Sequence, residues 1–294
     1  MKTWITLSVS VLAGTLCLAA HANQPNYTQD GFFLGLGADF NSINLTQNSW
    51  GEGISNIQTT TGSVSNGIAE GTGAPFHPII NSLSPSFQAG YFKNIAGTPN
   101  LIGVKFFYQY LNATATDTNL YIPQVGSTTS AVTGATSALF GYVNATSVQP
   151  TINQEMALLL FGGFSIGNTS FYLGAGPSLM NLKSRNLYSI GYADFEGATI
   201  DVTGLVSYSS PSFWSWGATA QLGATYFFNP CWFIDLAYTY TLTGSHTTKH
   251  QQTFANRSDL GTTVYATSGT LYTKDTMSVK NQSVMISINK VLNF

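Results

Sequence analysis

Apolar and polar side chains alternate with a period of two along eight stretches of this chain. Such alternation indicates β-strands that present one apolar face and one polar face. In the last stretch, Val284, Ile286 and Ile288 occupy one face, while Ser287 and Asn289 occupy the other. The fourth stretch is apolar on both faces, so the pattern does not determine which of its faces points outward. The eight stretches are residues 31–44, 84–93, 101–112, 154–166, 170–183, 214–228, 232–242 and 283–294.

The connections between these stretches alternate between long and short. Short turns are expected at residues 94–100, 167–168 and 229–230, and long polar segments at 45–83, 114–153, 185–213 and 244–276. A soluble β-sandwich also alternates apolar and polar residues, but it gives no reason for this regular change of loop length. Strands of about 10 tilted residues are long enough to cross a bilayer, and in lipid they must close into a ring. The pattern therefore predicts an all-β, antiparallel, up-and-down transmembrane β-barrel of eight strands.

The long segments leave one architectural alternative open. They are rich in Thr, Ser, Asn and Gly, which is typical of hydrated surface loops. A hairpin over residues 261–272, with Ser268 and Gly269 at its centre, is expected to extend the strands beyond the membrane. If such segments supplied a further pair of strands to the ring, the barrel would have ten.

The first 22 residues have the features of a secretory signal peptide. Lys2 provides the positive start, residues 5–20 are mostly apolar, and Ala20 and Ala22 form a cleavage site. Cleavage would remove Cys17 and leave Cys231 alone, which excludes an internal disulfide and a cysteine metal cluster. The predicted organisation is thus a signal peptide at 1–22 and one barrel domain at 23–294.

Charge is scarce along the chain. Only 7% of the residues are charged, whereas soluble domains have about 25%. Beyond the signal peptide no uninterrupted apolar run approaches the roughly 18 residues that a membrane helix needs. No basic patch is present either, so nucleic acid is not expected as a partner.

Aromatic residues on the apolar face gather toward the two ends of the predicted strands. Membrane β-barrels carry such girdles because aromatic rings favour the boundary between lipid and water. Lys290 is the exception on this face. The girdle near the short turns comprises Phe32, Tyr91, Phe171, Tyr226, Phe228, Trp232 and Phe294, and the girdle near the long segments comprises Phe40, Tyr108, Tyr110, Trp214, Trp216, Tyr238 and Tyr240.

The closing strand that ends on Phe294, the strand pattern and the girdles together resemble the small outer-membrane β-barrel proteins of bacteria. The OmpA transmembrane domain, OmpW and the opacity-type porin-like proteins are of this kind, and the resemblance covers residues 31–294. It implies the outer membrane of a Gram-negative bacterium, with short periplasmic turns and long extracellular loops. It also implies contact with lipid and lipopolysaccharide, assembly by the barrel-assembly machinery through the C-terminal strand, and a host or surface ligand for the loops.

The polar face of the predicted barrel carries a small set of lumen residues. Eight strands enclose little more than their own side chains. Lys105 and Asp235 lie at similar depth, so we expect them to pair across the lumen; separate solvation by lumen water is the alternative. The expected polar and ionisable lumen residues are Asp39, Lys105, Gln109, Glu155, Gln221 and Asp235.

Candidate catalytic residues are few and unspecific. His77, His246 and His250 lie in long segments, and Ser245 beside His246, with Asp259 nearby in the chain, is a permissible nucleophile and base. His246 and His250 are spaced to bind a metal only weakly. We therefore expect no enzyme activity, no catalytic or metal site and no cofactor.

Two functions remain for such a barrel. The first is a structural or surface-interaction role, such as that of an adhesin, with a mostly plugged lumen. The alternative is a narrow OmpW-like channel for small or hydrophobic solutes, and a lipid-modifying enzyme at the rim is a remote third.

Overall fold

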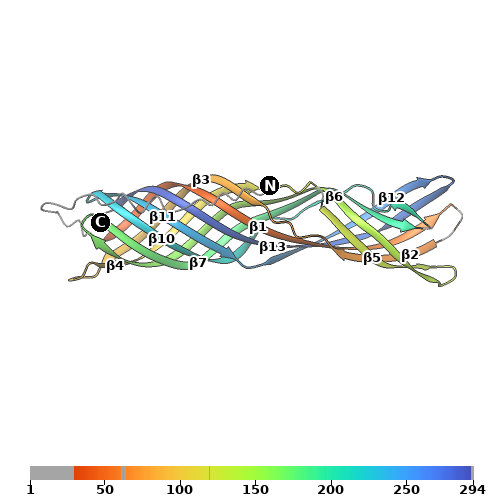
Figure 1. Cartoon of the computed structure of the whole chain (residues 1–294), viewed down its shortest axis with the longest axis horizontal. Helices are drawn as coiled ribbons and strands as arrows, with labels where there is room; N and C mark the ends of the chain where they lie inside the picture. The colour runs from red at the N-terminus through yellow and green to blue at the C-terminus, as the bar shows by residue number, and fades with distance from the viewer. Residues whose placement is uncertain (1–29, 61, 63, 119, 196, 293–294) are drawn as a thin grey trace, which may run out of the picture.

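One elongated sheet of antiparallel strands, wound into a tube, makes up this protein (Figure 1). This is a computed structural model, and it describes residues 30–292 except 61, 63, 119 and 196. The predicted signal peptide, its Ala20 and Ala22 cleavage site and the terminal Phe294 lie outside the described residues. No helix in the described part is long and apolar enough to cross a membrane.

Eight strands follow one another round a closed ring. The ring closes because β13 pairs with β1 along their whole lengths, from Phe32 opposite Leu292 to Thr59 opposite Tyr265. This confirms the predicted antiparallel barrel, with eight strands in the ring rather than ten. In ring order the strands are β1 (Gly31–Thr59), β3 (Ile79–Asn94), β4 (Asn100–Thr114), β6 (Thr136–Ile166), β7 (Thr169–Phe195), β10 (Phe213–Asn229), β11 (Trp232–Thr243) and β13 (Thr263–Leu292).

The three predicted short turns lie together at one end of the tube, which we call the short-turn end. Gly97 and Gly167 take positive φ there, a conformation that glycine adopts without steric cost. In the third turn the Asn229 side chain accepts hydrogen bonds from the backbone N–H groups of Cys231 and Trp232, at 2.8 and 2.9 Å. The chain therefore reverses tightly at each of these turns, as the sequence predicts.

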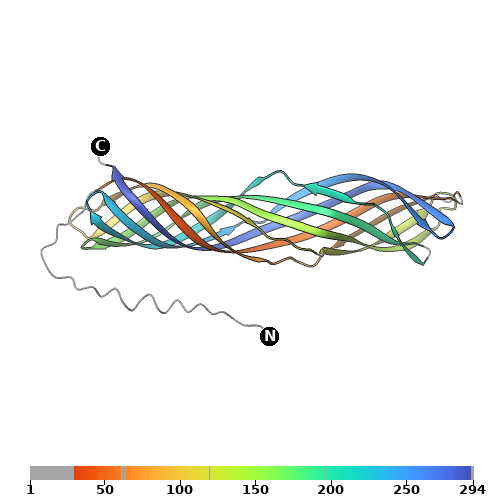
Figure 2. The ribbon, with the colours of Figure 1, turned by 90° about the horizontal axis from the view of Figure 1, so that it is seen from above.

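The opposite end was predicted wrongly. The long segments are mostly strands, not hydrated loops, and they continue the barrel as what we call the extension (Figure 2). The turn of the last hairpin lies at Gly261, between β12 and β13, whereas Ser268 and Gly269 lie within β13. The extension is built from the far halves of β1, β6, β7 and β13 together with β2 (Val64–Thr72), β5 (Leu120–Ser130), β8 (Ala198–Asp201), β9 (Val206–Ser209) and β12 (His246–Leu260).

The extension is almost a second ring. Its strands run in the order β12, β13, β1, β2, β5, β6 and β7, with β8 and β9 paired to β7. Between β12 and β8 the described contacts are made by side chains. Asn256 Nδ2 and Ser258 Oγ both donate to the backbone oxygen of Asp201, at 3.0 and 2.6 Å. Side chains thus close the seam that backbone pairing leaves.

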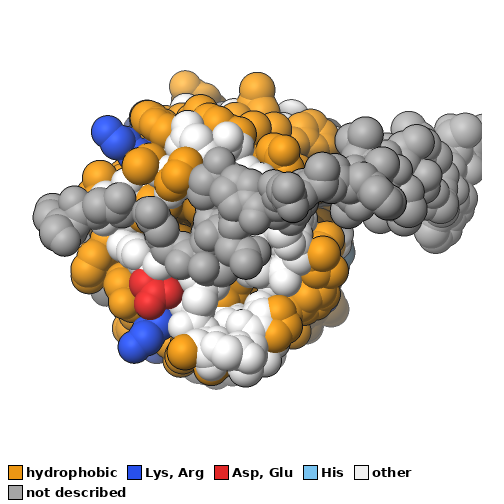
Figure 3. Space-filling model, turned by 90° about the vertical axis from the view of Figure 1, so that its left-hand side faces the viewer, with side chains coloured by type: hydrophobic (Ala, Val, Ile, Leu, Met, Phe, Trp, Pro, Cys, Tyr) orange, Lys and Arg blue, Asp and Glu red, His pale blue; other side chains and the backbone are white. Residues whose placement is uncertain are grey.

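The polarity of the two faces inverts where the ring passes into the extension. On β1, Leu36 and Phe40 point outward and are 67% and 57% exposed, whereas Ile43 and Leu45 point inward and are 0% exposed. On β13, Ile286 points outward and Val279, further along the same strand toward the extension, points inward. The space-filling view of the short-turn end shows the apolar side chains gathered round the outside of the tube (Figure 3). The ring therefore presents apolar side chains to lipid, whereas the extension encloses an apolar core like that of a water-soluble barrel.

Strand length fixes how far the extension reaches. β1 has 29 residues, compared with the roughly 9–11 that cross a bilayer. With a rise of about 3.3 Å per residue and a tilt of about 40°, this strand spans roughly 70 Å along the barrel axis. Because the hydrocarbon core takes about 30 Å, the extension stands roughly 40 Å beyond it.

Candidate functional site

The short-turn end of the lumen is narrowed by aromatic side chains. Phe33 lies edge-on to Phe233 at 5.4 Å between ring centroids, and Phe227 lies 4.8 Å from Phe233. Phe92 and Val291 complete this buried cluster. A pocket runs past these rings from Asn94 and Gly167 at the short turns to Lys105 and Asp235, and its volume is only about 40 Å³, room for no more than a few water molecules.

An ion pair crosses the lumen above the aromatic cluster. Lys105 Nζ lies 3.2 Å from Asp235 Oδ2, with both side chains 2% exposed. Lys105 also donates to the Tyr172 hydroxyl at 2.7 Å, and that hydroxyl donates to Asp235 Oδ1 at 2.9 Å. Gln88 donates to Asp235 at 3.3 Å. The sequence placed Lys105 and Asp235 at one depth, and the structure brings them into contact; it adds Tyr172, which sequence reasoning missed.

A second polar layer surrounds Glu155. Its carboxylate accepts hydrogen bonds from Thr241 Oγ1 at 2.5 Å, Gln109 Nε2 at 2.7 Å and Asn281 Nδ2 at 2.9 Å. Three donors on one carboxylate offset much of the cost of burying its charge. This layer shows how a buried carboxylate is held here without a cation.

The two remaining predicted lumen residues differ in how well they are bonded. Gln221 donates to Thr239 Oγ1 at 2.9 Å, and its Oε1 lies 3.3 Å from the Tyr172 hydroxyl. Asp39 is also buried, and among the described residues only the Ser86 side chain interacts with its carboxylate as a hydrogen-bond donor, without a well-aligned geometry. All six predicted lumen residues therefore point inward, and Asp39 is the least well compensated.

A band of apolar side chains fills the lumen where the membrane-spanning ring meets the extension. Its central residues have no accessible surface at all, so the lumen has no open path through this level. They are Ile43, Leu45, Ile152, Met180, Leu182 and Val279, each 0% exposed.

Above this band lies one more polar layer. The buried carboxylate of Asp275 accepts a hydrogen bond from Ser49 Oγ at 2.6 Å and from the Tyr208 hydroxyl at 3.4 Å. Tyr208 stacks on His250 with 4.5 Å between ring centroids. Burial raises the pKa of Tyr208 above its usual range, and burial lowers the pKa of His250 although the Asp275 carboxylate opposes that shift.

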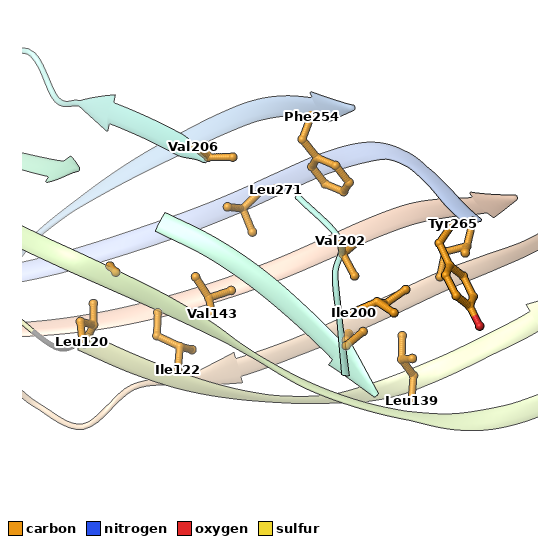
Figure 4. Close-up of a cluster of buried hydrophobic side chains, with 14 of the residues drawn as sticks. Leu120, Ile122, Leu139, Val143, Ile200, Val202, Val206, Phe254, Tyr265 and Leu271 are labelled. Carbon is orange, nitrogen blue, oxygen red and sulfur yellow. The ribbon is translucent and has the colours of Figure 1, made fainter. Parts of the chain in front are cut away.

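An apolar core then fills the rest of the extension (Figure 4). It includes Ile57 of β1, Ile122 of β5 and Leu271 of β13, whose side chains converge from different strands. Counted from the short-turn end, the lumen thus contains the aromatic cluster, two polar layers, the apolar band, one more polar layer and the apolar core of the extension.

The predicted aromatic girdles lie on the outside of the ring. Each girdle residue that the structure describes is exposed or half-buried, from Phe32 at the short-turn end to Trp216 at the other. Lys290 is exposed as well, and its ammonium group lies 5.6 Å from the centroid of the Trp232 ring. The outward apolar side chains of the ring form what we call the apolar belt. Since Trp232 belongs to the short-turn girdle, this lysine lies at the edge of the belt rather than at its middle.

The candidate catalytic residues have structural contacts instead. His246 stacks on Phe213 with 4.0 Å between ring centroids, and Asp259 is an exposed partner of Arg257 at 3.9 Å. His77 Nδ1 lies 3.1 Å from Thr46 Oγ1 on the outer surface. In the described part of the chain no group of three or more His, Cys, Asp or Glu is placed to hold a metal ion.

Sequence reasoning missed a groove on the outside of the extension. It has a volume of about 480 Å³ and lies between the end of β2 and the start of β5. Tyr121 lines it, and behind Tyr121 stand Tyr142 and Tyr192, with ring centroids 5.0 and 4.9 Å apart in succession. We call these three residues the tyrosine row. The groove is lined by Thr72, Gly73, Ala74, Pro75, Asp117, Leu120, Tyr121 and Pro123.

Comparison with known proteins shows similarity to solved outer-membrane barrels. No protein-family profile matches the sequence, and no curated protein matches it. The outer membrane protein OprG from Pseudomonas aeruginosa is 12% identical, over 92% of this chain and 100% of its own, with a TM-score of 0.38. Neisserial surface protein A is 12% identical over 85% and 97%, with a TM-score of 0.27. The outer membrane protease OmpT from Escherichia coli is 8% identical over 93% and 99%, with a TM-score of 0.33. Since these three TM-scores are below 0.5, the functions of these proteins do not transfer to this chain.

Proposed function

We propose that this protein is an outer-membrane barrel of a Gram-negative bacterium that holds a rigid surface structure outside the cell and binds partners there. The membrane-spanning ring anchors the chain, and the extension is the part that meets the surroundings. The short-turn end faces the periplasm, as in bacterial barrels generally. In this proposal the protein is neither a channel nor an enzyme.

The filled lumen is the observation that carries the proposal. A channel needs a continuous polar path, and the band around Ile43, Ile152 and Leu182 closes the lumen with side chains that have 0% exposure. The aromatic cluster around Phe33 and Phe233 narrows it near the short-turn end. These features speak against the narrow OmpW-like channel, which stays the alternative function, and the separated histidines give a rim enzyme no support.

The extension supports the second half of the proposal. It is continuous with the membrane-spanning strands, since β1, β6, β7 and β13 each run through both halves. A barrel that served only as an anchor or a plug would need none of this length. We therefore assign the extension to interaction at the cell surface, and the barrel-assembly machinery is expected to insert the chain through its C-terminal strand.

Two measurements test the proposal. Single-channel recordings in planar bilayers should show no reproducible conductance steps; stable steps would favour the channel. Cysteines introduced in a Cys231→Ser background at Thr133, in the β5–β6 turn, and at Thr98, in a short turn, report the orientation. An impermeant thiol reagent on whole cells should label Thr133→Cys and spare Thr98→Cys. The reverse pattern would contradict the orientation.

A further inference from the structure

The outer surface of the extension has a concave site that combines aromatic, hydroxyl and carboxylate groups. We propose that this groove, with the tyrosine row as its wall, binds an uncharged or amine-bearing oligosaccharide displayed on another surface. The inference rests on the proposed function, because it requires the extension to lie outside the cell.

The first step is the accessible face of Tyr121. This side chain is 52% exposed, and Tyr142 covers one of its faces, with the two rings inclined by 31°. On the other side β2 ends at Thr72, one strand away, so the groove begins where the sheet is interrupted. The uncovered face of Tyr121 is therefore directed to the groove. The C–H groups of a pyranose ring pack well on such a face, because the face of an aromatic ring carries partial negative charge.

The second step is the rigidity of that wall. Tyr142 and Tyr192 pair directly across β6 and β7, and their rings stack at 28°. The row thus braces Tyr121 from behind, which lowers the entropy lost when a ligand packs on its ring. Tyr142 and Tyr192 act as positioning residues, whereas Tyr121 makes the contact.

The third step is the size and polarity of the groove. A volume of about 480 Å³ falls within the range of small-ligand sites, and it suits a short run of sugar rings. Thr72 and Asp117 supply a hydroxyl and a carboxylate beside the apolar Pro75 and Pro123. Carbohydrates present the same mixture of C–H faces and hydroxyl groups.

The fourth step is charge, which narrows the ligand class. β2, β5 and β6 contain no Lys or Arg, while Glu70 and Asp117 lie on or beside the groove and Asp194 lies on β7 opposite Phe140. The nearby cation is Lys274 of β13, and its ammonium group is held over the Trp50 ring at 3.8 Å. Phosphorylated, sulfated or sialylated sugars would be repelled by this surface. Hydroxyl-rich or amine-bearing sugars would not.

The height of the groove, together with its negative charge, argues against the bacterium's own lipopolysaccharide as the ligand. Tyr142 precedes Gln154, where the apolar belt ends on β6, by twelve residues. This places the tyrosine row roughly 30 Å above the belt, beyond the lipid headgroups. The phosphate-rich part of lipopolysaccharide lies at those headgroups, so we assign the groove to a glycan that approaches from outside.

A glycan array printed with neutral, amine-bearing, sialylated and sulfated oligosaccharides tests the proposal. The full chain in detergent is labelled at Cys231, remote from the groove, and the strongest neutral or amine-bearing glycan is then titrated in solution. Tyr121→Ala should weaken its binding at least tenfold, while Tyr121→Phe should stay within about twofold of the parent. Tyr188→Ala removes an exposed tyrosine outside the groove lining and should have no effect.

Each contrary outcome is informative. No binding to any neutral or amine-bearing glycan, binding to anionic glycans alone, competition by purified lipopolysaccharide, or full affinity in a folded Tyr121→Ala variant would overturn the inference. Intrinsic tryptophan fluorescence shows whether each variant has folded. If Thr133→Cys is labelled on cells and the array is silent, only the groove assignment fails. If Thr133→Cys is not labelled, the proposed function fails with it.

Discussion

Replacing Lys105 by Met should destabilise the barrel strongly, because the change leaves a buried charge uncompensated. Asp235 would keep hydrogen bonds from Tyr172 and Gln88 but lose the ammonium group 3.2 Å away. Removing one partner of a buried pair costs about 3–5 kcal/mol. The loss should be larger here than for an isolated pair, since the buried Asp39 carboxylate also interacts with the Lys105 ammonium group.

Removing both charges should restore most of the stability. The double variant Lys105→Met/Asp235→Asn removes both charges of the pair, and we expect it to unfold within about 2 kcal/mol of the parent. Arg257→Met is the matched control. Arg257 and Asp259 are 3.9 Å apart and 72% and 74% exposed, and such a surface pair contributes under about 1 kcal/mol.

Urea unfolding in phospholipid vesicles, followed by tryptophan fluorescence, measures these differences. The four proteins should share one m-value, so that shifts in midpoint report stability. The reasoning is wrong if Lys105→Met unfolds with the parent, or if Asp235→Asn adds to its loss instead of reversing it. Lys105→Met should also stay silent in planar bilayers, because the apolar band around Ile43 and Ile152 remains closed.

Three further predictions concern other levels of the barrel. Ile152→Ala should cost about 2–5 kcal/mol in the same urea assay, because it opens a cavity in a fully buried band; a loss below about 1 kcal/mol would mean that the lumen there is loosely packed. Gly90→Val should fail to fold in vesicles, since a Cβ at this position would lie 2.7 Å from the Phe33 ring and meet backbone as well, whereas a variant that folds normally would show that this wall can move. His250 should titrate below its usual pKa of 6.5 in an NMR pH series, because burial outweighs the Asp275 charge. The unfolded chain then takes up the proton first, so stability should fall as the pH drops below 6.5, and a His250 that titrates above 6.5 would reverse that sign.

The membrane-spanning half of the fold was predictable because lipid imposes one rule on every strand. Outward positions such as Leu36 and Ile286 had to be apolar, which fixed the phase of each strand and hence the inward direction of Lys105 and Asp235. Residues 154–166 were ambiguous in sequence because Leu158, Leu159 and Leu160 are consecutive; here Leu159 points inward beneath the apolar band.

The extension was not predictable by the same rule, because its strands place polar side chains outward and apolar side chains inward. Once β1 leaves the apolar belt, Asn44 and Thr46 face water while Ile43 and Leu45 face the core. A short run of this inverted pattern, rich in Thr and Asn, has the composition of a loop. The groove depends on where β2 ends relative to Tyr121, which is a property of register and leaves no mark in the sequence.

The unbroken strands have a consequence for how the protein meets its surroundings. Flexible binding loops sample many orientations. The strands here run without a break from the membrane to the tip of the extension, so they hold the groove at one height and one angle. A polysaccharide capsule much thicker than the roughly 40 Å reach of the extension would cover the groove and prevent a ligand on another surface from reaching it. On a bacterium with a thin capsule, the groove would instead be accessible at all times.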